Sequence, residues 1–496
     1  MRKTLIGAVI VAATALTPAA HAAAPSPTAV RAAAPLPTAA YTAASSPPAE
    51  PSPAAIDDYL RQVVADTGLP GLSVVVTRGD RVVHAAGYGE DSEGAPVTAD
   101  TPMRIASVSK SFTAMAVMTL VEDGRIALDR PVADQLPGFA LADPRFADVT
   151  VRHLLNQTSG FSDTTVDVTA LESATSLADY ADGLRPAALA ADPGARYEYC
   201  NVNYDLAARL VEVASGRSFG DYLRAEVFGP LGMGRSAVSA AEVRPADGYN
   251  SVFGAWLSRP ELPGFLDSSG GGGVITTAAD MGRWLISQNG NGVQLVSPEG
   301  LRTMHTPSAV DDYAMGWVPE DGGALVHPGN LFTYSAVQAV VPETGYGFAV
   351  LTNSAALHDD TYDVLLGLIA LSEGRQPDAA GGSRQVFELV LGLILVAAAG
   401  LAVLGVRRSA RWARRRADAP AWRVGPRFLP LLAPVAVLAA FPDLLSILTN
   451  GRTITWEQLT YFAAPLTITV VVVALAGAAT AVARLLGLLR LRSSVH

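Results

Sequence analysis

Three long apolar stretches near the C-terminal end constrain the fold of this chain more than any other feature. They cover residues 386–406, 428–448 and 459–483. A helix needs about 20 mainly apolar residues to cross the hydrocarbon core of a bilayer, and each stretch is long enough. Because a segment inside a bilayer must pair its own backbone N–H and C=O groups, each stretch is expected to be helical. The sequence therefore predicts three transmembrane helices, preceded by a separate domain.

Charged residues predict the orientation of these helices. Six arginines lie in the first part of the predicted loop 407–427, and three more lie in the tail 484–496. By the positive-inside rule both segments are cytoplasmic, so the residues before 386 lie outside the cell. Residues 1–22 agree, because they have the basic start, apolar run and small-residue cleavage site of a secretory signal peptide; an uncleaved anchor is the alternative. We expect a multi-pass protein of the cell membrane with an extracytoplasmic main domain and a cytoplasmic C-terminus.

Composition divides the extracytoplasmic part into linkers and one domain. Residues 23–53 are mainly Ala, Pro, Ser and Thr, which predicts a disordered linker. A second linker is expected at 373–385, so that the domain covers 54–372. From residue 383 onward, 13 arginines and 4 acidic residues give a net charge of +9, whereas the preceding 382 residues carry 23 basic and 42 acidic residues, a net charge of −19. So acidic an exported domain argues against nucleic acid as a partner.

The domain is predicted to have strands at both ends and helices in the middle. A helix begins after Ser52 and Pro53, and a helix at 361–371 closes the domain. Helical patterns dominate the residues in between. Runs rich in β-forming residues predict strands at 72–77, 81–86, 324–327, 334–341 and 346–352. The expected fold class is α+β, with one antiparallel sheet formed by both ends of the domain and flanked by helices.

Lys110 is the one lysine that remains after removal of the predicted signal peptide, in a chain that otherwise uses arginine. A guanidinium stays protonated near neutral pH, whereas a buried ammonium can lose its proton. Ser107 precedes Lys110 by three residues, a spacing that places both side chains on one face of a helix. A desolvated lysine in that position can accept the serine proton and make the oxygen nucleophilic. From this motif alone, a helix N-terminus with a solvent-facing lysine is an equal alternative.

Further motifs follow this pair in a definite order. Residues 151–160 read Val-Arg-His-Leu-Leu-Asn-Gln-Thr-Ser-Gly, residues 199–201 read Tyr-Cys-Asn, residues 270–280 are glycine-rich, and residues 327–329 read His-Pro-Gly. The ordered set resembles the serine β-lactamase and penicillin-binding protein superfamily, in the branch with class C β-lactamases, D-alanyl-D-alanine carboxypeptidases and related esterases. The resemblance covers residues 54–372. It implies a β-lactamase/transpeptidase-like fold and hydrolysis through an acyl-enzyme.

The resemblance also implies which residues carry the chemistry. Ser107 is the expected nucleophile, and Lys110 and Tyr199 are the expected proton acceptors, with Tyr199 later donating to the leaving group. The backbone N–H groups of Ser107 and Asn330 are expected to form the oxyanion hole.

Three further residues are expected to bind substrate. Asn201 offers both a donor and an acceptor to a substrate amide or to Lys110. Gly329 leaves room for substrate along the strand edge. His327 stands where many relatives have lysine, and a neutral imidazole holds a carboxylate less strongly than an ammonium does. This substitution favours hydrolysis of an ester or amide, of the esterase or D-amino-acid peptidase or carboxypeptidase type.

Several alternatives remain open from the sequence. The domain could be a non-turnover penicillin-binding-type receptor or cell-wall sensor coupled to the membrane helices, or a β-lactamase. A transporter subunit built on the helices is disfavoured, because the apolar stretches carry few ionisable residues. The expected partner is a small-molecule or peptide substrate, with cell-wall fragments among the candidates; whether there is a protein partner stays open, and the receptor alternative would require one. The seven histidines show no metal-binding spacing, so no metal and no cofactor are proposed.

Two other patterns have a structural interpretation. Residues 216–220 match the G-x-S-x-G elbow of α/β-hydrolases, but a predicted helix precedes them, so Ser218 is expected to cap the next helix instead. Cys200 is the only cysteine, which excludes an intrachain disulfide, and a small buried residue is favoured there over a reactive thiol.

Overall fold

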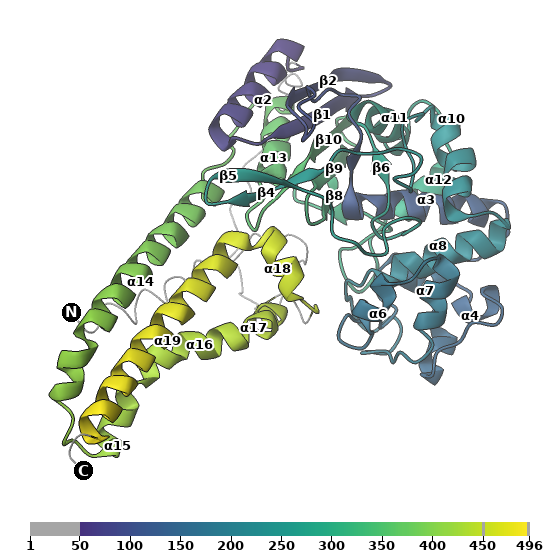
Figure 1. Cartoon of the computed structure of the whole chain (residues 1–496). Coiled ribbons are helices and arrows are strands. Elements are labelled where there is room, and N and C mark those ends of the chain that lie inside the picture. The colour runs from purple at the N-terminus through teal and green to yellow at the C-terminus, as the bar shows by residue number, and fades with distance from the viewer. Residues whose placement is uncertain (1–49, 449–451, 494–496) are drawn as a thin grey trace, which may run out of the picture.

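The computed structural model describes residues 50–448 and 452–493. The predicted signal peptide and most of the predicted linker 23–53 lie outside these residues. An α+β domain forms the N-terminal part of the described chain, and long C-terminal helices extend away from it (Figure 1).

One antiparallel sheet of six strands forms the centre of the α+β domain. Its strand order combines both ends of the domain, with the first two strands beside the last, as the sequence predicted. The strands in spatial order are β2 (Arg81–Gly89), β1 (Gly71–Arg78), β10 (Tyr346–Thr352), β9 (Ser335–Val341), β8 (Leu325–Asn330) and β7 (Val318–Pro319).

Helices cover both faces of this sheet. On one face, α2 (Pro53–Thr67) and α13 (Thr361–Ser372) pack against Val74 and Val76 of β1. On the other face, Val75 belongs to the core that includes α11 (Ala278–Gln288) and α3 (Ser109–Glu122). Because successive side chains of a strand point to opposite faces, a strand covered on both sides needs apolar residues at consecutive positions, which explains the three valines 74–76 of β1.

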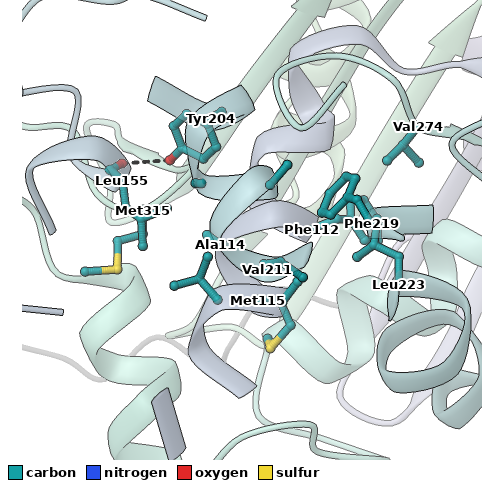
Figure 2. Packing of buried hydrophobic residues seen from close by; sticks show 14 of the residues in the cluster. Phe112, Ala114, Met115, Leu155, Tyr204, Val211, Phe219, Leu223, Val274 and Met315 are labelled. Carbon is teal, nitrogen blue, oxygen red and sulfur yellow. Dashed lines mark hydrogen bonds between the residues drawn. The ribbon is translucent and has the colours of Figure 1, made fainter. Parts of the chain in front are cut away.

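Helix α3 lies in the middle of the domain and is buried almost all round. Phe112 stacks on Trp284 of α11, with ring centroids 4.0 Å apart, and meets Phe228 edge-on at 5.8 Å. On its other side, α3 packs against α8 (Val202–Ser215), where Met115 and Val211 belong to the same core (Figure 2). Core residues thus surround α3, and this packing fixes the position of the residues at its N-terminus.

Shorter elements complete the domain. Ser218 accepts a hydrogen bond from Asp221 N at the start of α9, so the G-x-S-x-G pattern is a helix cap, as expected. Two small sheets, β3–β6 and β11–β4–β5, consist of strands of two to five residues. The shorter helices are α4 (Val132–Gln135), α5 (Val151–Leu155), α6 (Val168–Glu172), α7 (Leu177–Gly183), α9 (Phe219–Leu223), α10 (Gly229–Leu231), α12 (Pro298–His305) and the turns η1 (Ala106–Val108), η2 (Pro144–Asp148) and η3 (Arg224–Phe228). The small strands are β3 (Met103–Arg104), β4 (Gly248–Val252), β5 (Ala255–Arg259), β6 (Ile275–Thr276) and β11 (Ser354–Ala355).

Two C-terminal helices are long and apolar enough to cross a membrane, α14 (Ser383–Arg414) and α19 (Ala464–Ser493). They lie side by side, and α16 (Leu429–Ala439) packs along α19 (Figure 1). Helices α16 and α17 (Phe441–Leu448) are bent by 65° and make a third, broken span if they are counted as one. Short elements α15 (Ala421–Val424), η4 (Gly425–Arg427) and α18 (Trp456–Phe462) connect them.

The helix boundaries differ from those predicted, and prolines explain two of the differences. The first helix continues beyond residue 406 through the arginines up to Arg414. The second apolar stretch breaks at Ala440, two residues before Pro442. The third breaks at Ala463, two residues before Pro465. A proline lacks the N–H for the preceding turn and clashes with its carbonyl, so a new helix begins there with proline in its first turn.

Polar contacts bind the start of α14 into the α+β domain. The buried Arg384 side chain pairs with Asp360 at 3.5 Å and donates to Ser251 Oγ at 2.9 Å and to the carbonyl of Thr67. One turn later, Glu388 accepts a hydrogen bond of 2.6 Å from the Gly254 N–H. The domain is therefore fixed to its first long helix by buried polar groups.

Candidate active site

Three residues that the sequence singled out lie together at the N-terminal end of α3. Ser107 Oγ lies 3.0 Å from Lys110 Nζ and 2.7 Å from Tyr199 Oη. Ser107 belongs to the single turn η1, which leads into α3, and Tyr199 comes from the segment before α8. The hydroxyl, the amine and the phenol are thus within hydrogen-bonding distance.

The residue before the serine has an unusual backbone conformation. Ala106 has φ of 50°, in the left-handed region that residues other than glycine rarely adopt. Such a conformation costs on the order of 1–3 kcal/mol and persists only where the surroundings enforce it. Here the carbonyl of Val274 accepts from the N–H of Ile105, and β8 packs directly against 105–107. The strained turn presents Ser107 at the start of the buried helix.

Lys110 is fully buried and has three oxygen neighbours. Besides Ser107 Oγ, its Nζ lies 2.8 Å from Asn201 Oδ1 and 2.7 Å from the carbonyl of Gly271, and it faces the Tyr199 ring at 4.8 Å. An ammonium has three N–H donors, one for each oxygen. A neutral amine has two, which Asn201 and Gly271 can accept, and its lone pair is then directed at Ser107. The same arrangement of atoms therefore accommodates lysine in both protonation states.

The glycine-rich segment 270–273 forms a packed wall behind Lys110. A Cβ on Gly270 would lie 2.3 Å from the Tyr204 carbonyl, so only glycine fits there. Thr113 Oγ1 donates to the Gly270 carbonyl at 2.7 Å, and the Gly271 N–H donates to Asp205 Oδ1 at 3.1 Å. These bonds fix the Gly271 carbonyl in front of the lysine. Gly271 was missed from the sequence, because a backbone acceptor has no side-chain signature.

Gln157 orders the segment that carries Tyr199 and Asn201. Its side-chain oxygen accepts from the Cys200 N–H at 3.0 Å, and its carbonyl accepts from the Glu198 N–H at 2.9 Å. Cys200 is buried, and its thiol donates to Asp163 Oδ1 at 3.2 Å. Burial, and then the nearby Asp163 carboxylate, raise the pKa of this thiol well above its ordinary value. Cys200 is therefore an unreactive packing residue.

His327 is buried and neutral. Its Nδ1 lies 2.7 Å from the Pro328 carbonyl and its Nε2 lies 3.0 Å from Tyr313 Oη. Only a protonated nitrogen can face a carbonyl, so Nδ1 carries the proton and Nε2 accepts from Tyr313. Burial, followed by the charge of Lys110, lowers the pKa of His327 to about 3. Tyr313 is a second residue that the sequence did not reveal, since no motif surrounds it.

Gly329 brings strand β8 against the serine. A Cβ at this position would lie 2.3 Å from the carbonyl of Ile105 and 3.0 Å from Ser107 N. The absence of a side chain thus allows the close approach of the two segments and leaves the Ser107 N–H uncovered. Asn330 follows as the last residue of β8 and is exposed. Asn201, the remaining predicted residue, contacts Lys110 as described.

The other histidines in the site's surroundings have structural contacts. His153 caps helix α5 by accepting from the Thr150 N–H, and His305 contacts Gln288 at 3.2 Å. Within residues 50–448 and 452–493, no group of three or more His, Cys, Asp or Glu side chains is arranged to hold a metal ion.

The family follows from comparison with known proteins. A family model described as Beta-lactamase matches residues 56–371, well over half of the chain. The chain belongs to this family. This confirms the β-lactamase and penicillin-binding protein superfamily that the ordered motifs indicated, and it supports the expectation of a serine hydrolase.

Two curated relatives illustrate the similarity. Penicillin-binding protein 4 of Amycolatopsis lactamdurans is 32% identical over 333 residues, which cover 61% of this chain and 86% of that protein. Protein flp of Staphylococcus aureus (strain NCTC 8325 / PS 47) is 28% identical over 317 residues, which cover 60% of this chain and 62% of that protein. In both relatives the similarity covers about three fifths of this chain.

Solved structures share the fold. The octameric penicillin-binding protein homologue from Pyrococcus abyssi has a TM-score of 0.57 at 26% identity and covers 66% of this chain and 78% of its own. D-amino acid amidase from Ochrobactrum anthropi SV3 has a TM-score of 0.52 at 24% identity and covers 62% of this chain and 94% of its own. Both confirm the β-lactamase/transpeptidase-like α+β fold that the sequence predicted.

Proposed function

We propose that this protein is a membrane-tethered, extracytoplasmic hydrolase that cleaves an ester or amide through an acyl-enzyme on Ser107. The observation that carries the proposal is the position of Ser107 Oγ between Lys110 Nζ at 3.0 Å and Tyr199 Oη at 2.7 Å. A serine hydroxyl requires a neighbouring base to become nucleophilic, and here two candidate bases contact it.

The first half-reaction forms the acyl-enzyme. The lone pair of Lys110 Nζ accepts the hydroxyl proton while Ser107 Oγ attacks the substrate carbonyl carbon. The Ser107 N–H, left uncovered by Gly329, and the Asn330 N–H stabilise the oxyanion that develops on the carbonyl oxygen. Tyr199 delivers a proton to the leaving oxygen or nitrogen as the tetrahedral intermediate collapses, and the proton held by Lys110 restores the phenol. In the second half-reaction, water replaces the leaving group and the same groups act in reverse.

The neutral His327 bears on the type of substrate. With a pKa of about 3, its imidazole carries no charge near neutral pH, so it cannot attract a substrate carboxylate as an ammonium would. Its Nε2 already accepts from Tyr313. We therefore favour an esterase or D-amino-acid peptidase over a β-lactamase.

Membrane tethering is supported by where the basic residues lie. Helix α14 ends at Arg411 and Arg414, and α19 ends at Arg490 and Arg492. Both basic ends lie far from the α+β domain (Figure 1). If α14, the bent pair α16–α17 and α19 are three spans, the positive-inside rule places these ends in the cytoplasm and the α+β domain outside.

The proposal is tested on the full chain in detergent or nanodiscs. With a p-nitrophenyl ester and a fluorophosphonate, we expect release of nitrophenol and covalent labelling at Ser107 by mass spectrometry. Ser107→Ala abolishes both, and Lys110→Arg abolishes turnover, because a guanidinium cannot accept the proton. Ser218→Ala, which changes an exposed helix cap, is the matched control and leaves turnover unaffected. A stable adduct without turnover would favour the receptor, and full activity of Lys110→Arg would contradict the assigned base.

A further inference from the structure

The segment between the last two membrane-associated helices lies against the active site. Phe332, two residues after Asn330, packs edge-on to Tyr461 at 6.2 Å and against Phe462 at 6.4 Å. Both aromatic residues belong to α18, and one residue, Ala463, separates α18 from α19. Two residues of extended chain span at most about 7 Å, so the Cα atom of Asn330 lies within about 7 Å of the Cα atom of Phe332, which contacts α18.

Further contacts fix α18 in this position. Arg259 Nη1 donates to the Thr460 carbonyl at 2.6 Å, and its guanidinium lies 3.4 Å over the Tyr461 ring. Two residues later, Glu261 accepts from the N–H groups of Phe332 and Thr333, each at 3.0 Å. Glu261 thus fixes the loop that follows Asn330, the predicted oxyanion-hole residue. Arg259, at the end of β5 and two residues before Glu261, binds α18.

An ion pair makes a second connection, on the tyrosine side of the site. Arg452 Nε lies 3.0 Å from Asp163 Oδ2, and Asp163 Oδ1 accepts from the Cys200 thiol at 3.2 Å. Cys200 lies between Tyr199 and Asn201. Residues 452–462 therefore contact two neighbours of the active site: Asp163, which binds Cys200 beside Tyr199, and Phe332, which follows Asn330 by two residues.

The contacts with α18 limit how far the active site can lie from the membrane surface. Helix α19 is a candidate span that begins at Ala464, directly after α18. If α19 crosses the bilayer, α18 lies at the bilayer surface on the domain's side. Its Trp456 and Tyr461 are of the two residue types enriched at the headgroup level of membranes. On the opposite side, buried Arg384 and Glu388 hold the start of α14 against the domain. The domain is therefore not joined to α14 by a flexible linker that would let it move away from the membrane.

We propose that the substrate of this site is a membrane-anchored amphiphile whose ester or amide lies at the level of the lipid headgroups and is cleaved without leaving the bilayer. The inference rests on the proposed acyl-enzyme chemistry of Ser107 and adds the class of substrate. Headgroup layers are only some 5–8 Å thick on each side of a hydrocarbon core of about 30 Å, so a site whose Asn330 lies two residues from a contact with α18 is close to that layer.

The experiment uses the full chain in phosphatidylcholine vesicles and three probes with the same scissile p-nitrophenyl ester. The first is a glutaryl p-nitrophenyl ester on the amine of dioleoyl phosphatidylethanolamine. The second carries a long polyethylene glycol spacer between that headgroup and the ester. The third is the same ester on phosphoethanolamine, without acyl chains. We expect the short-spacer lipid probe to be hydrolysed at least tenfold faster than the chain-free probe, and faster than the long-spacer probe.

Each other outcome has a distinct meaning. Equal rates for the lipid and chain-free probes, or hydrolysis of the long-spacer probe in preference to the short one, would overturn the membrane-substrate inference while the Ser107 chemistry stands. If no probe is cleaved above the level of Ser107→Ala, the proposed function fails and this inference fails with it.

Discussion

Tyr313 Oη and His327 Nε2 lie 3.0 Å apart in the buried core of the active site, and the imidazole accepts this hydrogen bond in its neutral form. The pKa of His327, lowered to about 3 by burial and by the charge of Lys110, lies far below that of an unfolded histidine. Protonation of the imidazole therefore opposes folding, and this has a measurable effect on stability in acid.

We expect the stabilising contribution of neutral His327 to be complete above about pH 6.5 and to be lost as the pH falls toward 3, because the unfolded imidazole takes up a proton first. Between pH 7 and 4.5 the loss is about 2–3 kcal/mol. In His327→Gln, which cannot titrate, the free energy of unfolding should fall less over this range. Urea unfolding of both proteins at the two pH values measures the difference, and an identical pH dependence would contradict the assignment.

Replacing Tyr199 by Phe should lower kcat by about 10²–10⁴-fold with little change in KM, because it removes the proton donor and acceptor 2.7 Å from Ser107 Oγ and keeps the ring. Labelling by a fluorophosphonate should slow in parallel. Tyr222→Phe is the matched control: its hydroxyl contacts Thr119 on the surface of α3, and kcat should not change. A Tyr199→Phe enzyme with unaltered kcat would remove Tyr199 from the mechanism.

A methyl group at residue 329 should disable the site. In Gly329→Ala the new Cβ would lie 2.3 Å from the Ile105 carbonyl and 3.0 Å from Ser107 N, so either β8 or the serine turn must move. We expect kcat to drop at least a hundredfold, since removing a single oxyanion-hole donor already costs about 10²–10³. Gly234→Ala, where a Cβ meets no atom within 4 Å, should keep full activity. Comparable activities of the two variants would show that β8 does not pack against the serine as described.

Removing Arg384 from its buried pair with Asp360 should be strongly destabilising. Removing one partner of a buried ion pair leaves the other charge unpaired, which typically costs about 3–5 kcal/mol. Arg384→Met should therefore lower the thermal unfolding temperature of the detergent-solubilised chain by many degrees. Arg375→Met breaks an exposed pair with Glu373, and such pairs contribute about 0–1 kcal/mol. Equal shifts in the two variants would be inconsistent with a buried, paired Arg384.

The sequence predicted the sheet well because its strands carry strong local patterns at both ends of the domain. Ser107, Lys110 and Tyr199 were found through motifs, and the structure brings them together. The Gly271 carbonyl and Tyr313 were missed for physical reasons: a carbonyl belongs to every residue, and a lone tyrosine 114 residues beyond Tyr199 gains its meaning only from tertiary contact.

The helix boundaries were wrong for a different reason. Counting apolar residues locates a stretch long enough to cross a bilayer, but it does not show where a proline interrupts the helix within that stretch. Pro442 and Pro465 were visible in the sequence, and each marks the first turn of a new helix. The second break separates α18 from α19, which is the arrangement that brings Tyr461 and Phe462 against Phe332, two residues beyond Asn330.

Arg384 has a practical consequence for anyone who wishes to produce this enzyme as a secreted fragment. A polypeptide cut at the end of α13 would retain Asp360, Ser251 and the Thr67 carbonyl in its interior but would lack the side chain that satisfies all three. The truncated domain would contain a cavity lined by polar groups without hydrogen-bond partners. Aggregation or poor yield of that fragment would be caused by the loss of Arg384 and not by a defect of the catalytic domain. A fragment extended past Glu388 keeps these partners.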